Sequence, residues 1–89
     1  MLAAILLLFA CAGAPVQEMS DARQAVAAAE QTLADKPASP DLIRARQYLQ
    51  AAQTALDAQD YSTAREDARL ARQLALRALG VKPDVPGRS

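Results

Sequence analysis

Proline and glycine divide this alanine-rich chain into stretches that each have the length of one or two helices. The interruptions lie at Pro15, at the segment 36–40 with its two prolines, and at Gly80 with Pro83 shortly after it. Proline lacks the amide donor that an interior helical position needs, and glycine readily ends a helix. Alanine, which fills much of the sequence between the breaks, is the best helix former. The pattern therefore predicts an all-α fold.

Apolar residues recur at alternating spacings of three and four in the first two of these stretches, 18–35 and 39–57, as on one face of a helix. The two seams are Met19, Ala22, Val26, Ala29 and Leu33, and Leu42, Ala45, Leu49, Ala52 and Leu56. Large and small side chains alternate in both, so we expect the two helices to interdigitate as an antiparallel hairpin. Ser39 is expected to cap the second helix, with Pro40 in its first position.

A third helix is predicted from Asp60, because this residue is a good cap and the phase of the apolar positions shifts just after it. The new stripe consists of Tyr61, Ala64, Ala68, Ala71, Ala75 and Ala78. Gly80 is placed to end the helix in a left-handed conformation. One unbroken helix from Ser39 to Leu79 is the alternative. We therefore expect an antiparallel helical hairpin or a small three-helix bundle over residues 18–80, followed by a disordered tail over 81–89.

The start of the chain has the pattern of an export signal. Residues 2–10 are uninterruptedly apolar, too few for a membrane span but typical of a signal peptide. The end of this run and the next residue, Leu8-Phe9-Ala10-Cys11, resemble the lipobox of bacterial lipoproteins. In a lipobox the cysteine is lipidated and the chain is cut just before it. We expect residues 1–10 to be a signal peptide with an apolar leader helix, Cys11 to be lipidated, and residues 11–17 to be a linker.

Two other interpretations of this start remain open. The stretch Ala12-Gly13-Ala14 fits an ordinary signal peptidase site, which would release a soluble periplasmic chaperone or carrier cut after Ala14. Cys11 could instead be a thiol buried in a core helix. No lysine or arginine precedes the apolar run, so we expect the charged region of the signal to lie upstream of Met1.

The chain offers little material for catalysis or ligand binding. It has no histidine and one cysteine, so we expect no metal site and no cofactor. The adjacent carboxylates Glu66 and Asp67 diverge on a helix, and Asp57 and Asp60 lie at a turn where capping explains at least one of them. We therefore expect no catalytic residues, no small-molecule substrate and no enzyme. Ten basic and ten acidic residues cancel, which argues against a nucleic-acid partner.

The third helix carries the candidate partner surface. Arg65, Arg69 and Arg72 share one face, and Leu70 and Leu74 lie beside the alanine stripe. This surface is expected to bind another envelope protein or a second copy. We expect Leu74 to lie at that contact and Leu49, on the second helix, to lie in the core. The alternative is a solvated face whose arginine stems cover alanine. The two tyrosines, at positions 48 and 61, are expected in core or boundary packing.

Two resemblances accompany these patterns. The stretch 52–75 resembles the turn of a tetratricopeptide repeat, with the usual glycine replaced by Gln59 or a neighbour; one such unit does not make a superhelix. Most of the chain resembles the bacterial envelope proteins grouped as domain of unknown function 4398. The residues that carry this second likeness are Leu42, Ala45, Arg46, Leu49, Asp60, Tyr61, Ala64 and Arg65. It implies a helical domain exposed to the periplasm, and it brings no activity. We expect a membrane-tethered helical scaffold or adaptor.

Overall fold

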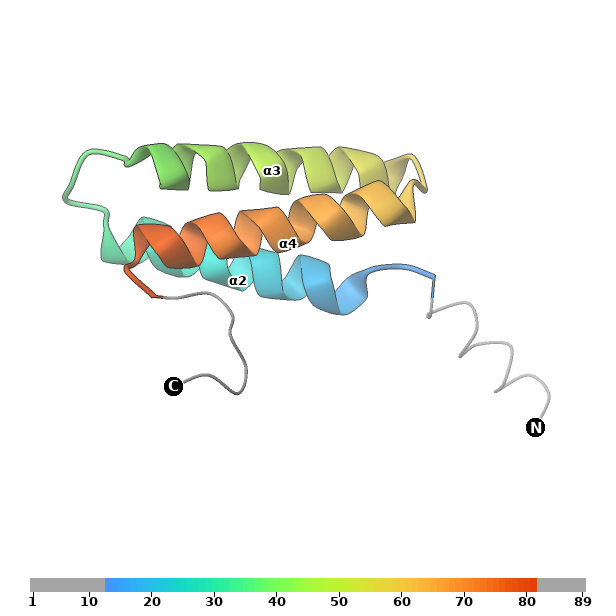
Figure 1. Ribbon diagram of the computed structural model, residues 1–89, viewed down its shortest axis with the longest axis horizontal. Coiled ribbons are helices and arrows are strands. Elements are labelled where there is room, and N and C mark those ends of the chain that lie inside the picture. Colours follow the sequence, from blue (N-terminus) through green and yellow to red (C-terminus); the bar gives the residue numbers. More distant parts are fainter. Residues whose placement is uncertain (1–12, 82–89) are drawn as a thin grey trace.

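The computed structural model describes residues 13–81, which form three α-helices and, within those bounds, no strand (Figure 1). The helices are α2 (Val16–Thr32), α3 (Pro40–Asp57) and α4 (Tyr61–Ala78), and each runs antiparallel to the one before. The protein is therefore a small all-α bundle, as the sequence predicts. The expected leader helix, the lipidated Cys11 and the tail from residue 82 lie outside the described residues.

The bundle has two distinct ends (Figure 1). One end holds the start of α2 and the turn between α3 and α4, and we call residues 13–18 and 57–65 the turn end. The opposite end holds the α2–α3 connection and the end of α4. We call residues 33–41 and 76–81 the loop end. Ion pairs support this placement, since Glu18 pairs with Arg65 at one end and Asp41 pairs with Arg77 at the other.

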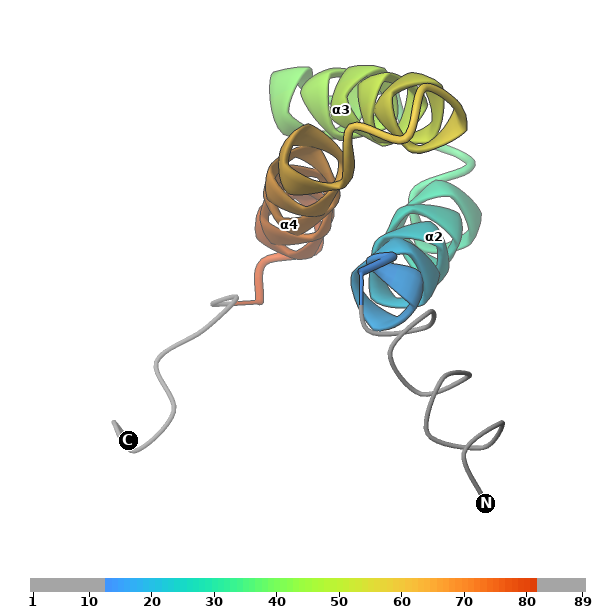
Figure 2. The same cartoon turned by 90° about the vertical axis from the view of Figure 1, so that its right-hand side faces the viewer.

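The three helices do not pack equally against one another. α3 and α4 share the most extensive contact, α2 packs mainly on α4, and α2 has the least contact with α3. Figure 2 shows the three helices viewed from one end of the bundle. The predicted hairpin of the first two helices is therefore the weakest of the three pairings. The lengths of the connections explain this difference. The short turn 58–60 keeps α3 directly against α4, whereas the longer segment 33–39 allows α2 to pack on α4 rather than on α3.

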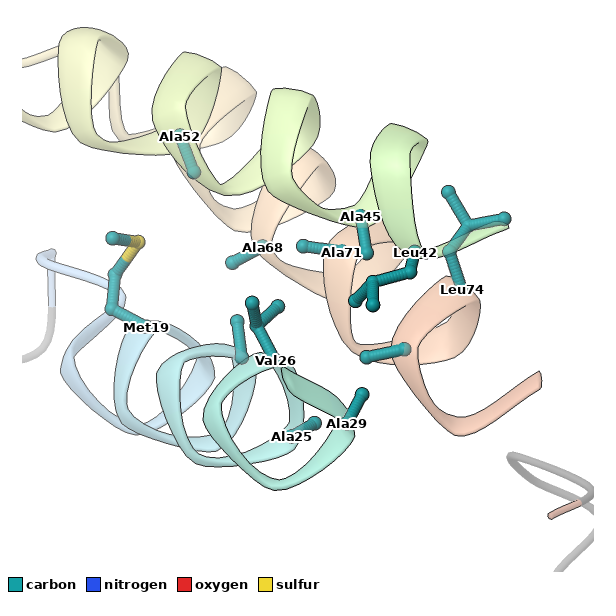
Figure 3. Packing of buried hydrophobic residues seen from close by; sticks show 12 residues of the cluster. Met19, Ala25, Val26, Ala29, Leu42, Ala45, Ala52, Ala68, Ala71 and Leu74 are labelled. Atoms are coloured by element: carbon teal, nitrogen blue, oxygen red, sulfur yellow. The ribbon is translucent and has the colours of Figure 1, made fainter. Parts of the chain in front are cut away.

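The core consists mostly of alanine (Figure 3). Its larger members are Met19 and Val26 from α2, Leu42 from α3 and Leu74 from α4. The remaining buried residues of the cluster are Ala22, Ala25, Ala29, Ala45, Ala52, Ala68, Ala71 and Ala75. Alanine allows the backbones to approach closely but removes little apolar area from water. The few large side chains therefore contribute a disproportionate share of the stability.

The predicted caps are confirmed. The Ser39 hydroxyl accepts a hydrogen bond from the Leu42 amide at 3.2 Å, and the Asp60 carboxylate accepts one from the Thr63 amide at 3.3 Å. Gly80 has φ +83° and ends α4, while the amide of Val81 reaches back to the carbonyl of Leu76 at 2.8 Å. This is the Schellman geometry, and it depends on the left-handed residue at Gly80.

The turn between α3 and α4 has the same geometry without a glycine. Gln59 has φ 63°, in the left-handed region, and its amide donates to the Leu56 carbonyl at 3.0 Å. The Asp60 amide donates to the Ala55 carbonyl at 2.8 Å. Asp60 thus closes α3 through its backbone and caps α4 through its side chain. One residue serves both helices, which explains how the chain reverses within three positions.

The first helix differs in its bounds from the expected 18–35. It begins at Val16 and ends at Thr32. Pro15 stands directly before it with φ −80°, a value that its ring favours, and its carbonyl accepts a hydrogen bond from the Met19 amide at 3.0 Å. The Pro15 side chain is fully buried. The end of the expected linker 11–17 is therefore part of the bundle.

Candidate functional site

Residues 13–15, which we call the strap, lie against the start of α4. A methyl group added at Gly13 would stand 3.7 Å from Cδ2 of Tyr61, so the tyrosine ring lies beside this glycine and leaves space for little more than a Cβ. The Nη2 atom of Arg65 donates a hydrogen bond to the Gly13 carbonyl at 3.4 Å. Together with the burial of Pro15, these contacts fasten the chain to the bundle from two residues after Cys11 onward.

Glu18 extends this attachment into the first turn of α2. Its Oε2 atom lies 3.7 Å from Nε of Arg65 and 3.8 Å from Nη2 of Arg69. All three side chains are partly exposed, so water and salt weaken each pair and the stabilisation is small. A carboxylate in the first turn of α2 also interacts favourably with the helix dipole, which is positive at this end. Arg65 therefore holds both the strap and Glu18.

The candidate surface predicted on α4 is only partly available. Arg65 and Arg69 are engaged with Glu18, whereas Arg72 is exposed and forms no ion pair within residues 13–81. Leu70 is half-buried. Leu74 is 5% exposed and belongs to the core. The expectation that Leu74 lies at a partner contact is wrong, because α4 packs on both other helices and its buried face is wider than the alanine stripe.

A groove that the sequence did not predict runs between α2 and α3. It has a volume of about 570 Å³ and is open to solvent. Val26 and Leu49 supply its apolar part. The other lining residues are Arg23, Glu30, Arg46, Gln50, Gln53, Thr54 and Asp57. The groove exists because α2 and α3 meet over a small area, and the helical periodicity of each seam could not reveal that.

Two polar contacts cross this groove between the helices. Arg23 donates from Nη2 to Oε1 of Gln53 at 2.5 Å, and Nε of Arg46 lies 2.7 Å from Oε2 of Glu30. Both contacts are exposed, so each contributes little to stability. They can exchange for contacts with a partner at small cost. The groove is thus a surface with an apolar floor and an adaptable polar rim.

The two tyrosines are both half-buried, but only Tyr48 packs against the core cluster. This agrees with the boundary packing expected of Tyr48. Tyr61 lies outside that cluster, at the start of α4. The position of Tyr61 beside Gly13 could not be predicted from the sequence, because these residues are far apart in the chain.

The polar and charged side chains of residues 13–81 all lie at the surface of the bundle. Throughout this part of the chain, no polar or charged side chain is buried. Its Asp and Glu side chains form no group of three that could hold a metal ion. None of the helices in the described range combines the length and the apolar character that crossing a bilayer requires.

The fold and the strap define a small all-α protein built as a three-helix bundle with an ordered lead-in. The chain belongs to the family described as Domain of unknown function (DUF4398), whose model matches residues 17–79. The match runs from the first turn of α2 to the residue after α4, so it includes the core and both reversals of the chain. The predicted resemblance is confirmed. Searches of curated proteins and of solved structures found no match.

Proposed function

We propose that the protein is a membrane-tethered helical scaffold or adaptor of the bacterial cell envelope, held by lipid on Cys11 and facing the periplasm. The lipobox-like Leu8-Phe9-Ala10-Cys11 motivates the tether. More than one acyl chain on that cysteine would anchor the protein firmly, because each buried methylene contributes about 0.8 kcal/mol.

The strap is the observation that carries this proposal. A cut before Cys11 leaves residues 13–15 in place on α4. A cut after Ala14 would remove Gly13, which lies beside Tyr61 and accepts the hydrogen bond from Arg65. It would also create a charged terminal amine on Pro15, a residue whose ring is fully buried. The strap therefore supports the lipoprotein over the soluble chaperone or carrier cut after Ala14.

The groove supports the adaptor role. Its floor of Val26 and Leu49 suits the apolar stripe of an amphipathic helix, and its charged and amide rim suits the polar flanks of that helix. We assign as its occupant a helix of another envelope protein. The partner would then bind in this groove and not on the face of α4 that the sequence predicts. Because family membership brings no activity, the absence of enzymatic function stays a prediction.

The likeness of α3 and α4 to a tetratricopeptide hairpin is part of the same proposal. Gln59 adopts the left-handed conformation that a turn glycine would favour. Ala64 and Ala68 are fully buried on the face of α4, where small residues permit close helix contact. Both features support a hairpin of the type that other proteins use as a binding unit.

The tether is tested by replacing the cysteine. Cys11→Ser removes the thiol that lipid requires, so we expect the protein to leave the membrane fraction or to keep its leader. Ala12→Ser is the matched control, because it changes the neighbouring small residue and keeps the thiol. Fractionation and immunoblotting follow both variants. A Cys11→Ser protein of mature size that still sediments with membranes would overturn the lipid tether.

The groove is tested by photo-crosslinking in intact cells. A photoreactive side chain at Gln50 stands in the groove, whereas the same group at Gln73 stands on the exposed face of α4. We expect Gln50 to give an adduct with another envelope protein, identified by mass spectrometry, and Gln73 to give none. An adduct with a second copy would replace the foreign partner by self-association. Equal adducts at both positions, or none at Gln50, would contradict the groove as the contact surface.

A further inference from the structure

We infer that the anchored bundle stands on the membrane by its turn end, in a fixed orientation, with the loop end held away from the bilayer. The inference rests on the proposed lipid at Cys11. It goes beyond that proposal because a tether by itself does not orient a domain. A flexible linker leaves the attached body free to rotate, and its reach grows with its length.

The distance between the lipid and the bundle is very short. Gly13 follows Cys11 by two residues, and an extended chain spans at most about 3.3–3.6 Å per residue. The Cα of Gly13 therefore stays within about 7 Å of the Cα of Cys11. Because Arg65 bonds the Gly13 carbonyl and Tyr61 lies beside Gly13, the start of α4 is held close to the lipidated residue. The chain between the lipid and the bundle is too short for the bundle to turn over.

The chemistry of the turn end suits the headgroup layer of a membrane. Val16 is 67% exposed, the largest exposure among the large apolar side chains described. Tyr61 is half-exposed and combines an apolar ring with a polar hydroxyl, a combination that favours membrane interfaces. Ala58 and Gln59 are exposed at the same end of the bundle and add no charge. A lipid surface would cover the Val16 side chain that the bundle leaves open.

The charges at this end limit how deep the contact goes. Asp57 and Asp60 are exposed, and charged groups stay hydrated because desolvation is costly. The contact is therefore shallow, and zwitterionic headgroups suit it better than anionic ones. The loop end lies much further out, since an 18-residue helix such as α4 is about 27 Å long.

A pair of alanines makes the orientation measurable. Ala58 lies at the turn end and Ala38 at the loop end, and both are exposed. In the lipidated full chain the Cys11 sulfur is a thioether, so Ala58→Cys and Ala38→Cys each provide one free thiol for a fluorophore. The protein is placed in phosphatidylcholine vesicles that contain headgroup spin-labelled lipid. We expect severalfold stronger quenching at position 58 than at position 38. Equal quenching would overturn the inference.

A second variant tests the short tether itself. Six glycine and serine residues inserted between Ala12 and Gly13 leave the strap and the bundle intact but lengthen the chain to the lipid. We expect the quenching at positions 58 and 38 to become similar. An unchanged difference would show that the short tether does not set the orientation. Intact mass separates the two proposals: lipidated protein with equal quenching defeats the orientation alone, whereas protein without lipid defeats the tether and the orientation together.

Discussion

Arg65 donates a hydrogen bond at 3.4 Å to the backbone carbonyl of Gly13, a residue 52 positions earlier in the chain. The contact joins the segment next to Cys11 to the beginning of the last helix. Arg65 also pairs with Glu18, so one side chain links the strap, α2 and α4. The folded bundle thereby includes residues that the sequence alone assigns to a linker.

Removal of the Arg65 guanidinium should loosen the strap more than it unfolds the bundle. Arg65→Ala deletes the bond to Gly13 and one ion pair, both partly exposed, so we expect a loss of about 1 kcal/mol or less in the free energy of unfolding. Amide hydrogen exchange in residues 14–18 should become faster. Arg69→Ala is the control, because it deletes a pair with Glu18 and leaves Gly13 bonded. Equal acceleration in both variants would show that the bond to Gly13 has no role.

Leu74 and Leu49 should respond to truncation in the reverse of the order that the sequence predicts. Leu74 is 5% exposed in an alanine core, so Leu74→Ala should cost about 2–4 kcal/mol. Leu49 is half-buried at the groove, and Leu49→Ala should cost about 1 kcal/mol. Urea unfolding followed by circular dichroism measures both. A larger loss for Leu49→Ala would mean that the core is packed differently.

Replacement of Gln59 by glycine should stabilise the protein. Gln59 holds φ 63°, where a side chain is strained and glycine is not. We expect Gln59→Gly to raise the free energy of unfolding by about 0.5–1 kcal/mol. Ala58→Gly is the matched control, because Ala58 has φ −84° and glycine there only adds freedom to the unfolded chain. Thermal melts in which both variants lose stability would contradict the assigned turn.

The alanines of the core should not tolerate enlargement. Ala52 is fully buried in α3, where two backbones approach closely, so Ala52→Leu should cost about 1–3 kcal/mol or rearrange the bundle. Ala51 is its exposed neighbour on the same helix, and Ala51→Leu should stay within about 0.5 kcal/mol of the parent. Denaturant unfolding of each variant measures its free energy of unfolding. A similar stability for both would show that α3 does not bury the Ala52 face.

The features predicted correctly from the sequence are those that local chemistry decides. Ser39, Asp60 and Gly80 end or begin helices because of what their own side chains and backbones permit, and neighbours in the fold do not alter this. The burial of Leu74 depends on how many helices pack on α4, which the alanine stripe does not specify. The strap and the groove depend on how distant segments meet, as in the hydrogen bond from Arg65 to the Gly13 carbonyl. Periodicity within one helix contains no information on such contacts.

The intact mass of the protein extracted from bacterial membranes tests the central claim most directly. A lipid tether with the strap retained predicts one species that begins at Cys11 and carries a thioether-linked diacylglyceryl group. The strap residues 13–15, which lie against the start of α4, are then present in the mature chain. An unacylated species that begins at Pro15 would contradict the tether, the strap and the orientation on the membrane at once.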